Sequence, residues 1–122
     1  MNPIIQYVES NYKIIEVKPG KMRYNYKCQL NAVHDAVNAK DESIAMCICI
    51  EDDYPFIHFV NKTKGKYIDN TFGYWSKDYR YYFVREIISA EFDLIHRTFS
   101  GFRAFLLSLV PWYVKIFTKV TV

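Results

Sequence analysis

The chain has 122 residues, of which 51% are hydrophobic and 18% aromatic, and its formal net charge is +3 at pH 7. This length predicts one domain, 1–122, with enough apolar side chains for a packed core. The basic residues are scattered, and a solvated turn explains the largest cluster, Lys62, Lys64 and Lys66, better than a nucleic-acid surface does, so we expect no nucleic-acid partner.

The first part of the chain predicts a helix, a strand and a second helix. Asn2-Pro3 ahead of apolar residues is typical of a capped helix with proline in its first turn. Residues 14–18 have the composition of a strand, which Pro19-Gly20 ends.

From Cys28 to about residue 39 the apolar spacing is helical. The larger apolar residues are predicted to form the buried stripe: Leu30, Val33 and Val37. The alanines are predicted to form a flank of small residues that lets the helix lie close to a sheet: Ala32, Ala36 and Ala39. His34, among Asn31, Asp35 and Asn38, is assigned to a solvated face.

Three strands in succession follow, which predicts an antiparallel meander. Residues 44–50 are apolar throughout, as in a central strand buried on both faces. Alternation predicts two faces there, one with Ile44, Met46, Ile48 and Ile50 and the other with Ala45, Cys47 and Cys49. Turns at 51–55 and 61–65 lead to strands at 56–60 and 66–71.

The register of the last two strands decides whether His58 faces Asp69. A four-residue loop at 62–65 places these two residues opposite each other. A three-residue loop between Lys62 and Lys66 places His58 opposite Asn70 instead. The sequence leaves both registers open, and the functional interpretation requires the first.

The C-terminal part, 89–122, is predicted to be helical after a strand at 81–87. Ser89 caps a helix from 90 to about 109, and Pro111 starts or kinks a last helix at 112–119. The uncharged stretch 104–114 is too short for a membrane span. We expect this stretch to pack over the sheet. Binding to a second copy or to a host protein is the second alternative, and contact with a membrane interface is the third.

Cys28, His58 and Asp69 carry the best functional signal. The positive partial charge at a helix start favours a thiolate, an imidazole serves as its base, and a carboxylate orients that ring. Backbone N–H groups at the same helix start can hold an oxyanion. Such chemistry needs no metal and no organic cofactor.

Cys28 opening a helix, His58 on a strand and Asp69 on the next strand resemble the papain-like and transglutaminase-like thiol superfamily, and the chain resembles small bacteriophage and bacterial proteins that share this arrangement. The resemblance covers about 25–73, the catalytic-type core of an α+β fold in which the cysteine-bearing helix packs on a small antiparallel sheet. It implies Cys28 as nucleophile, His58 as base and Asp69 as orienting group.

Gln29, Asn70 and Trp75 are candidates for oxyanion or substrate binding beside these three. The chain departs from the papain pattern in lacking an aromatic residue directly after Cys28. An upstream side chain for an oxyanion hole is not evident either; Gln6 is the candidate.

The remaining cysteines and histidines are assigned to structure. Cys47 and Cys49 lie in an apolar strand, and a zinc site formed by them with His58 lacks the usual paired ligand spacing. His96 is assigned to the surface. An odd number of cysteines and an N-terminus without signal-peptide features predict reduced thiols in the cytoplasm, the host's if the chain is phage-encoded.

The resulting hypothesis is a cysteine-dependent hydrolase or acyltransferase acting on an amide, ester or isopeptide carbonyl of a protein or peptide-like substrate. The rival hypothesis is a non-catalytic binding module, such as a phage inhibitor of a host factor. It would use the aromatic C-terminal region together with surface tyrosines such as Tyr74, Tyr79 and Tyr81.

Overall fold

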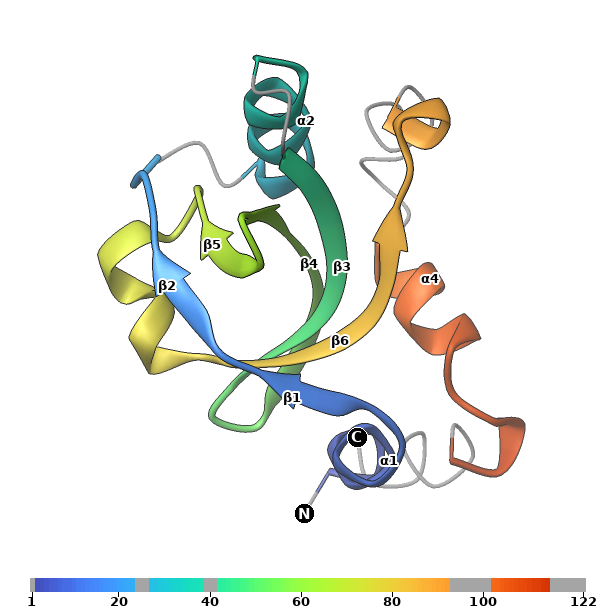
Figure 1. Ribbon diagram of the computed structural model, residues 1–122. Helices are drawn as coiled ribbons and strands as arrows, with labels where there is room; N and C mark the ends of the chain where they lie inside the picture. The colour runs from blue at the N-terminus through green and yellow to red at the C-terminus, as the bar shows by residue number, and fades with distance from the viewer. Residues whose placement is uncertain (1, 24–26, 39–41, 93–101, 115–122) are drawn as a thin grey trace.

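The protein is a mixed α+β fold built on one six-stranded sheet (Figure 1). The computed structural model describes residues 2–23, 27–38, 42–92 and 102–114. The strands are β1 (Lys13–Ile15), β2 (Val17–Pro19), β3 (Glu42–Glu51), β4 (Tyr54–Thr63), β5 (Lys66–Asp69) and β6 (Arg80–Ile87), in the order β1-β6-β3-β4-β5-β2. The predicted meander is confirmed as β3-β4-β5, in which neighbouring strands are antiparallel.

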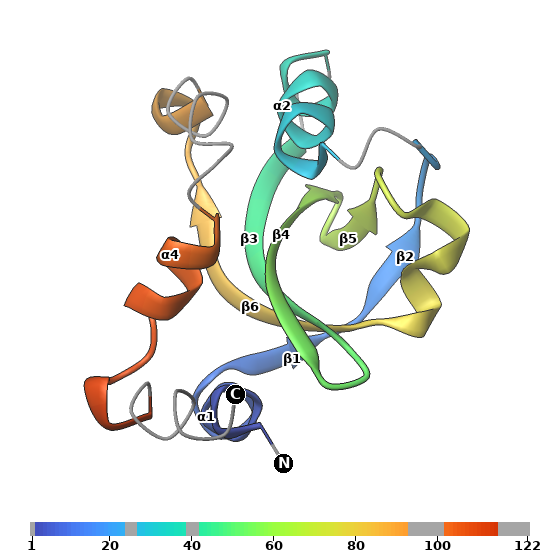
Figure 2. The same ribbon diagram turned by 180° about the vertical axis from the view of Figure 1, so that it is seen from behind.

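The sheet curls because one continuous segment of the chain, 13–19, pairs with β6 on one side of the sheet and with β5 on the other. β1 pairs antiparallel with β6, whereas β2, which follows after Glu16, pairs in parallel with β5. Figure 1 and Figure 2 show this segment crossing from one end of the curled sheet to the other. The curl separates an inner face from an outer face.

The alternation predicted for 44–50 is confirmed, and it supplies both cores. One side of β3 packs in an inner cluster of Ala45, Cys47, Cys49, Val60 and Tyr81. The other side joins an outer cluster that includes Ile44, Met46, Ile48, Ile50, Ile57 and Phe59. Helices cover this outer cluster.

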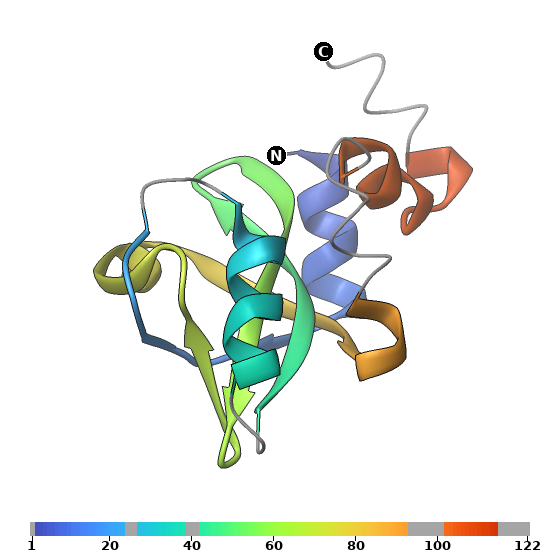
Figure 3. The same cartoon turned by 90° about the horizontal axis from the view of Figure 1, so that it is seen from above.

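In the described part of the chain, the α-helices that contribute to the outer cluster are α1 (Pro3–Asn11), α2 (Cys28–Asn38) and α4 (Phe102–Ser108). The predicted cap of α1 is confirmed, since the Asn2 side chain accepts a hydrogen bond of 2.8 Å from the Ile4 N–H and proline follows it. Figure 3 looks down on α2, which packs on β3 and β4.

The buried face of α2 differs from the predicted one. Cys28, Ala32 and Ala36 are buried, whereas Val37, assigned to the buried stripe, is 68% exposed. These three residues are spaced four apart and therefore form one stripe along the helix. Their small side chains allow α2 to approach the sheet closely, which outweighs the larger apolar area of the predicted stripe.

Two polar residues of α2 that we assigned to a solvated face are also buried. Asn31 donates from Nδ2 to Thr71 Oγ1 at 2.9 Å, and Asp35 forms a bidentate ion pair with Arg23 at 2.9 and 3.1 Å. Partners from distant segments therefore satisfy the hydrogen-bonding groups of both side chains, and these bonds compensate for the desolvation of the two residues. His34 is exposed, as predicted.

The described C-terminal residues hold shorter helices than predicted. A 3-10 turn, η2 (Ser89–Glu91), and α4 replace parts of the expected helix from 90 to 109, and residues 93–101 and 115–122 lie outside the described ranges. Leu106, Val110 and Val114 join the outer cluster as expected. Of the helices described, none combines the length and apolar character required to cross a membrane.

Candidate active site

His58 and Asp69 meet inside the curled sheet. His58 Nε2 lies 2.8 Å from Asp69 Oδ2, and the two residues are 1% and 0% exposed. Both come from strands, β4 and β5, so their backbones are held by the sheet. The structure therefore supplies the predicted pairing of an imidazole with a carboxylate.

The register that produces this pairing is neither of the two predicted. Thr63 pairs with Lys66, so the loop contains only Lys64 and Gly65, both with positive φ (52° and 79°). This two-residue loop suits the twist of antiparallel strands, and glycine adopts such a φ without strain. Our requirement that His58 lie directly opposite Asp69 was wrong.

The two side chains nevertheless share a face. The pairing of β4 with β5 ends at Asn61 and Ile68. Continued in the same register, it would set Asp69 opposite Val60, which lies on the same side of β4 as His58. Diagonal neighbours on one face remain within reach of long side chains. The contact between His58 and Asp69 still forms because the actual register differs from the required one by an even number of residues, which keeps both side chains on the same face.

Asp69 also fixes the chain that follows β5. Its Oδ1 accepts backbone hydrogen bonds of 2.8 Å from the N–H groups of Thr71 and Phe72, and its Oδ2 accepts one of 2.5 Å from the Tyr81 hydroxyl. Burial raises the pKa of Asp69, but the charge of His58 and the bound donors outweigh it, and the pKa is lowered. The carboxylate is thus ionised and held by four donors.

Cys28 is the first residue of α2, and together with Asp69 it influences the pKa of His58. Burial alone lowers the pKa of His58, but the charges and hydrogen bonds of Cys28 and Asp69 raise it from 6.5 to about 10. The ring is therefore protonated at pH 7. Because Nε2 binds Asp69, Nδ1 is the nitrogen left for Cys28.

An aromatic stack surrounds the charged ring. Phe72 lies parallel to His58 with centroids 4.4 Å apart, and Phe56 meets the ring edge-on at 6.0 Å. The negative face of an aromatic ring attracts a cation, so Phe72 favours imidazolium and fixes its plane.

Gln29 is the candidate closest to the sulfur. It is fully buried, its Oε1 lies 3.8 Å from Cys28 Sγ, and its Nε2 has no hydrogen-bond partner in the described ranges. A buried amide nitrogen without a partner is rare, because its desolvation is not compensated. The hydrogen-bonding capacity of this N–H group is therefore unused within the described ranges.

Asn70 and Trp75, the other two binding candidates, have different surroundings. Asn70 donates from Nδ2 to Asn61 Oδ1 at 2.9 Å and accepts from the Lys21 N–H at 3.1 Å. Its side chain therefore links β4 to the chain that follows β2. Trp75 lies in η1 (Gly73–Asp78) and is 44% exposed. Among the described contacts, none joins Trp75 to Cys28, His58 or Asp69.

The segment ahead of Cys28 is held against the Asp69 turn. Arg23 bonds to the chain at 70–71 twice, from its backbone N–H to Thr71 O at 2.9 Å and from its side chain to Asn70 O at 3.0 Å. A Cβ added to Gly20 would come within 2.3 Å of Asn70 Oδ1, so only glycine fits there. These contacts set the position from which the chain enters α2.

Cys47 and Cys49 line the inner cluster, as the structural assignment predicted. Both are fully buried, and burial raises the pKa of each thiol. In the ranges that the structure describes, no three His, Cys, Asp or Glu residues are grouped as metal ligands. His58 is engaged by Asp69 rather than by these cysteines.

Tyr81 is the site residue that we did not predict, since we assigned it to the surface with Tyr74 and Tyr79. Tyr81 is 2% exposed, whereas Tyr74 is 61% exposed. Its pairing with Cys49 across β3 and β6 turns it toward Asp69. Tyr81 and Phe83 are two residues apart, which indicates that they share one face of β6. The pairing of β6 with β3, which turns this face inward, was not predicted.

Replacing Tyr81 with phenylalanine tests this contact. The Tyr81 hydroxyl helps to lower the pKa of Asp69, so its removal is expected to raise that pKa. We expect the acid limb of Cys28 alkylation, measured with iodoacetamide from pH 3 to 7, to move to higher pH. Tyr82→Phe, a buried tyrosine in the outer cluster, is the control. An equal shift in both variants would contradict a specific role for Tyr81.

Comparison of the chain with protein-family models, with curated proteins and with solved structures found no match in any of the three.

Proposed function

We propose that the protein is a cysteine-dependent hydrolase or acyltransferase with a papain-like or transglutaminase-like site. Its substrate is an amide, ester or isopeptide carbonyl of a protein or peptide-like molecule. The observation that carries the proposal is the buried imidazole of His58, whose Nε2 lies 2.8 Å from Asp69 Oδ2 and whose pKa is raised by both Asp69 and Cys28. A protonated imidazole beside a sulfur favours the thiolate, which is the attacking form of cysteine.

In the proposed reaction the Cys28 thiolate attacks the carbonyl carbon, and the carbonyl oxygen takes up the negative charge. His58 gives its Nδ1 proton to the leaving amine or alcohol as the C–N or C–O bond breaks, which leaves a thioester on Cys28. Water or an amine then attacks the thioester and returns a proton to His58. The product is an acid after hydrolysis or a new amide after transfer, and the thiolate is restored.

Two groups are suited to the oxyanion. Cys28 and Gln29 stand in the first turn of α2, where backbone N–H groups have no acceptor within the helix. The second is the unpartnered Nε2 of Gln29, which belongs to the amide whose oxygen lies 3.8 Å from Cys28 Sγ and is our proposed side-chain donor. Asp69 does not react in this scheme; it keeps the His58 ring oriented and charged.

The thiols also bear on the cellular location. Cys28, Cys47 and Cys49 are all free. A nucleophilic cysteine must stay reduced to work, so we place the protein in a reducing compartment such as the cytoplasm.

The proposal is tested by the reaction of each cysteine with iodoacetamide at pH 6, followed by mass spectrometry of the digested protein. We expect label at Cys28, which keeps 6% exposure, and almost none at Cys47 and Cys49, whose pKa values burial raises. p-Nitrophenyl acetate, an activated ester, should leave an acetyl group on Cys28 with a burst of nitrophenolate.

The control is Cys28→Ala. This variant should lose both reactions while its melting temperature stays within about 5 °C of the wild type, since only a small buried sulfur is removed. Equal labelling of the three cysteines, or acetylation that persists in the variant, would contradict the proposal.

A further inference from the structure

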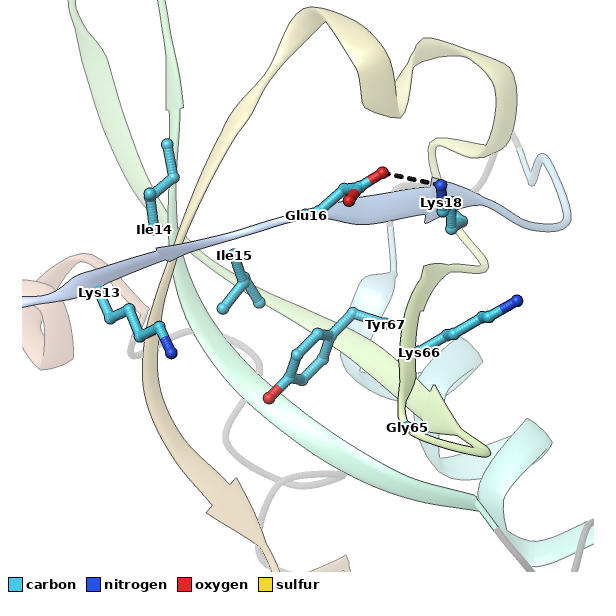
Figure 4. Close-up of a pocket in the computed structure, with 8 residues that line it drawn as sticks. All are labelled: Lys13, Ile14, Ile15, Glu16, Lys18, Gly65, Lys66 and Tyr67. Atoms are coloured by element: carbon cyan, nitrogen blue, oxygen red, sulfur yellow. Dashed lines mark hydrogen bonds and ion pairs between the residues drawn. The ribbon is translucent and has the colours of Figure 1, made fainter.

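A cleft of about 310 Å³ lies between the β1–β2 segment and the β4–β5 hairpin (Figure 4). None of Cys28, His58 and Asp69 lines it. The cleft exists because segment 13–19 changes partner at Glu16, from β6 to β5, and the sheet is not closed by pairing at that point.

The cleft carries uncompensated positive charge. Among the described residues that line it, Glu16 is the only acidic one, and Lys18 neutralises it at 2.7 Å. Within the described ranges, neither Lys13 nor Lys66 has a carboxylate at ion-pair distance. Lys62, on the neighbouring strand, adds a third cation 5.5 Å from the centre of the Tyr67 ring.

The charges are separated by an apolar floor. Figure 4 shows Lys13 and Lys66 toward opposite ends of the cleft, with Ile15 and the Tyr67 ring between them. A compact anion such as phosphate would need its donors to converge on one point. The arrangement instead suits a longer ligand that has acidic groups at both ends and apolar groups in the middle.

A strand edge borders the same cleft. β1 stands at one end of the strand order, with β6 as its neighbour, so its second edge pairs with no strand of the described sheet. Ile14 in this strand is 53% exposed. The N–H and C=O groups of an unpaired edge are a template for an extended polypeptide.

We propose that this cleft binds an extended acidic peptide segment that adds to the free edge of β1. Its acidic side chains approach Lys13 and Lys66, and its apolar side chains lie on Ile15 and Tyr67. A nucleic acid has the charge but not the main-chain donors and acceptors that pair with a strand. The site is separate from Cys28, so the inference does not depend on the proposed thiol chemistry.

Binding is measured by fluorescence anisotropy in low salt with the full chain carrying Cys28→Ala, which prevents any turnover of the probe. The probe is a fluorescein-labelled peptide of sequence Glu-Glu-Val-Val-Val-Glu-Glu, which has its acidic residues at both ends and its apolar residues in the middle. We expect Lys66→Glu to weaken the affinity by about tenfold or more, because a like charge then faces the ligand. Lys77→Glu, the same charge change in η1 outside the cleft, should alter the affinity by less than about twofold.

Two further probes separate the components of the proposal. The same peptide with N-methylated valines cannot form the strand hydrogen bonds and should bind at least about tenfold more weakly. A labelled single-stranded RNA of equal charge should bind more weakly than the peptide. Equal effects of Lys66→Glu and Lys77→Glu, unchanged binding after N-methylation, or preferred binding of the RNA would each overturn the assignment. Circular dichroism confirms that the variants fold.

Discussion

Replacing His58 with alanine is expected to slow the alkylation of Cys28 at pH 6 by at least about 100-fold. A cysteine without a cationic partner titrates near pH 8.5, so at pH 6 only about 1 in 300 such thiols is ionised. In the proposed mechanism the ring of His58, whose pKa is raised to about 10, is the cation beside the Cys28 sulfur. Loss of the ring removes that cation and the proton for the leaving group together.

The matched control is His34→Ala, which removes the exposed histidine of α2. It should alkylate at the wild-type rate, measured by mass spectrometry over a time course. His58→Gln should behave as His58→Ala does, because a neutral amide fills much of the space but carries no charge. A rate for His58→Gln close to that of the wild type would remove His58 from the mechanism.

The same histidine predicts how stability depends on pH. Its folded pKa of about 10 lies above the ordinary 6.5, so its contribution to stability is complete below pH 6.5 and is lost as the pH rises toward 10. Urea unfolding of the wild type should therefore show a falling free energy over this window. His58→Gln should show a smaller fall, and an equal fall would mean that other groups cause it.

Replacing Asp69 with alanine is expected to be the most destabilising single change in the site, by about 3–5 kcal/mol. Asp69 accepts from two backbone N–H groups, from Tyr81 and from His58. Its removal leaves a buried cation without a partner and opens the turn after β5. Because the pKa of Asp69 is lowered, its contribution is present above the ordinary value of 3.8 and is lost as the pH falls below it.

Urea unfolding at pH 7 measures the effect, with Asp53→Ala, an exposed aspartate in the β3–β4 turn, as control. The control should change the free energy of unfolding by less than about 0.5 kcal/mol. Asp69→Asn should fall between the two, since an amide oxygen can accept from part of the same donors. A loss below 1 kcal/mol for Asp69→Ala would show that the four contacts contribute little.

The features that depend on near neighbours in the chain could be predicted from local sequence. The Asn2 cap, the helix that begins at Cys28 and the alternating faces of β3 follow from local spacing and from local hydrogen bonds, so they were predictable. The same alternation put His58 and Asp69 on one face whichever even register formed.

The features that depend on distant partners were set by contacts between segments remote in the chain. Both predicted registers for β4 and β5 failed because the left-handed conformation of Lys64 shortens the loop, and local composition did not indicate it. The polar side of α2 became buried because Arg23 and Thr71, remote in sequence, satisfy Asp35 and Asn31. Tyr81 reaches Asp69 only because β6 pairs with β3, a contact between strands whose partners are chosen by the packing of the whole sheet.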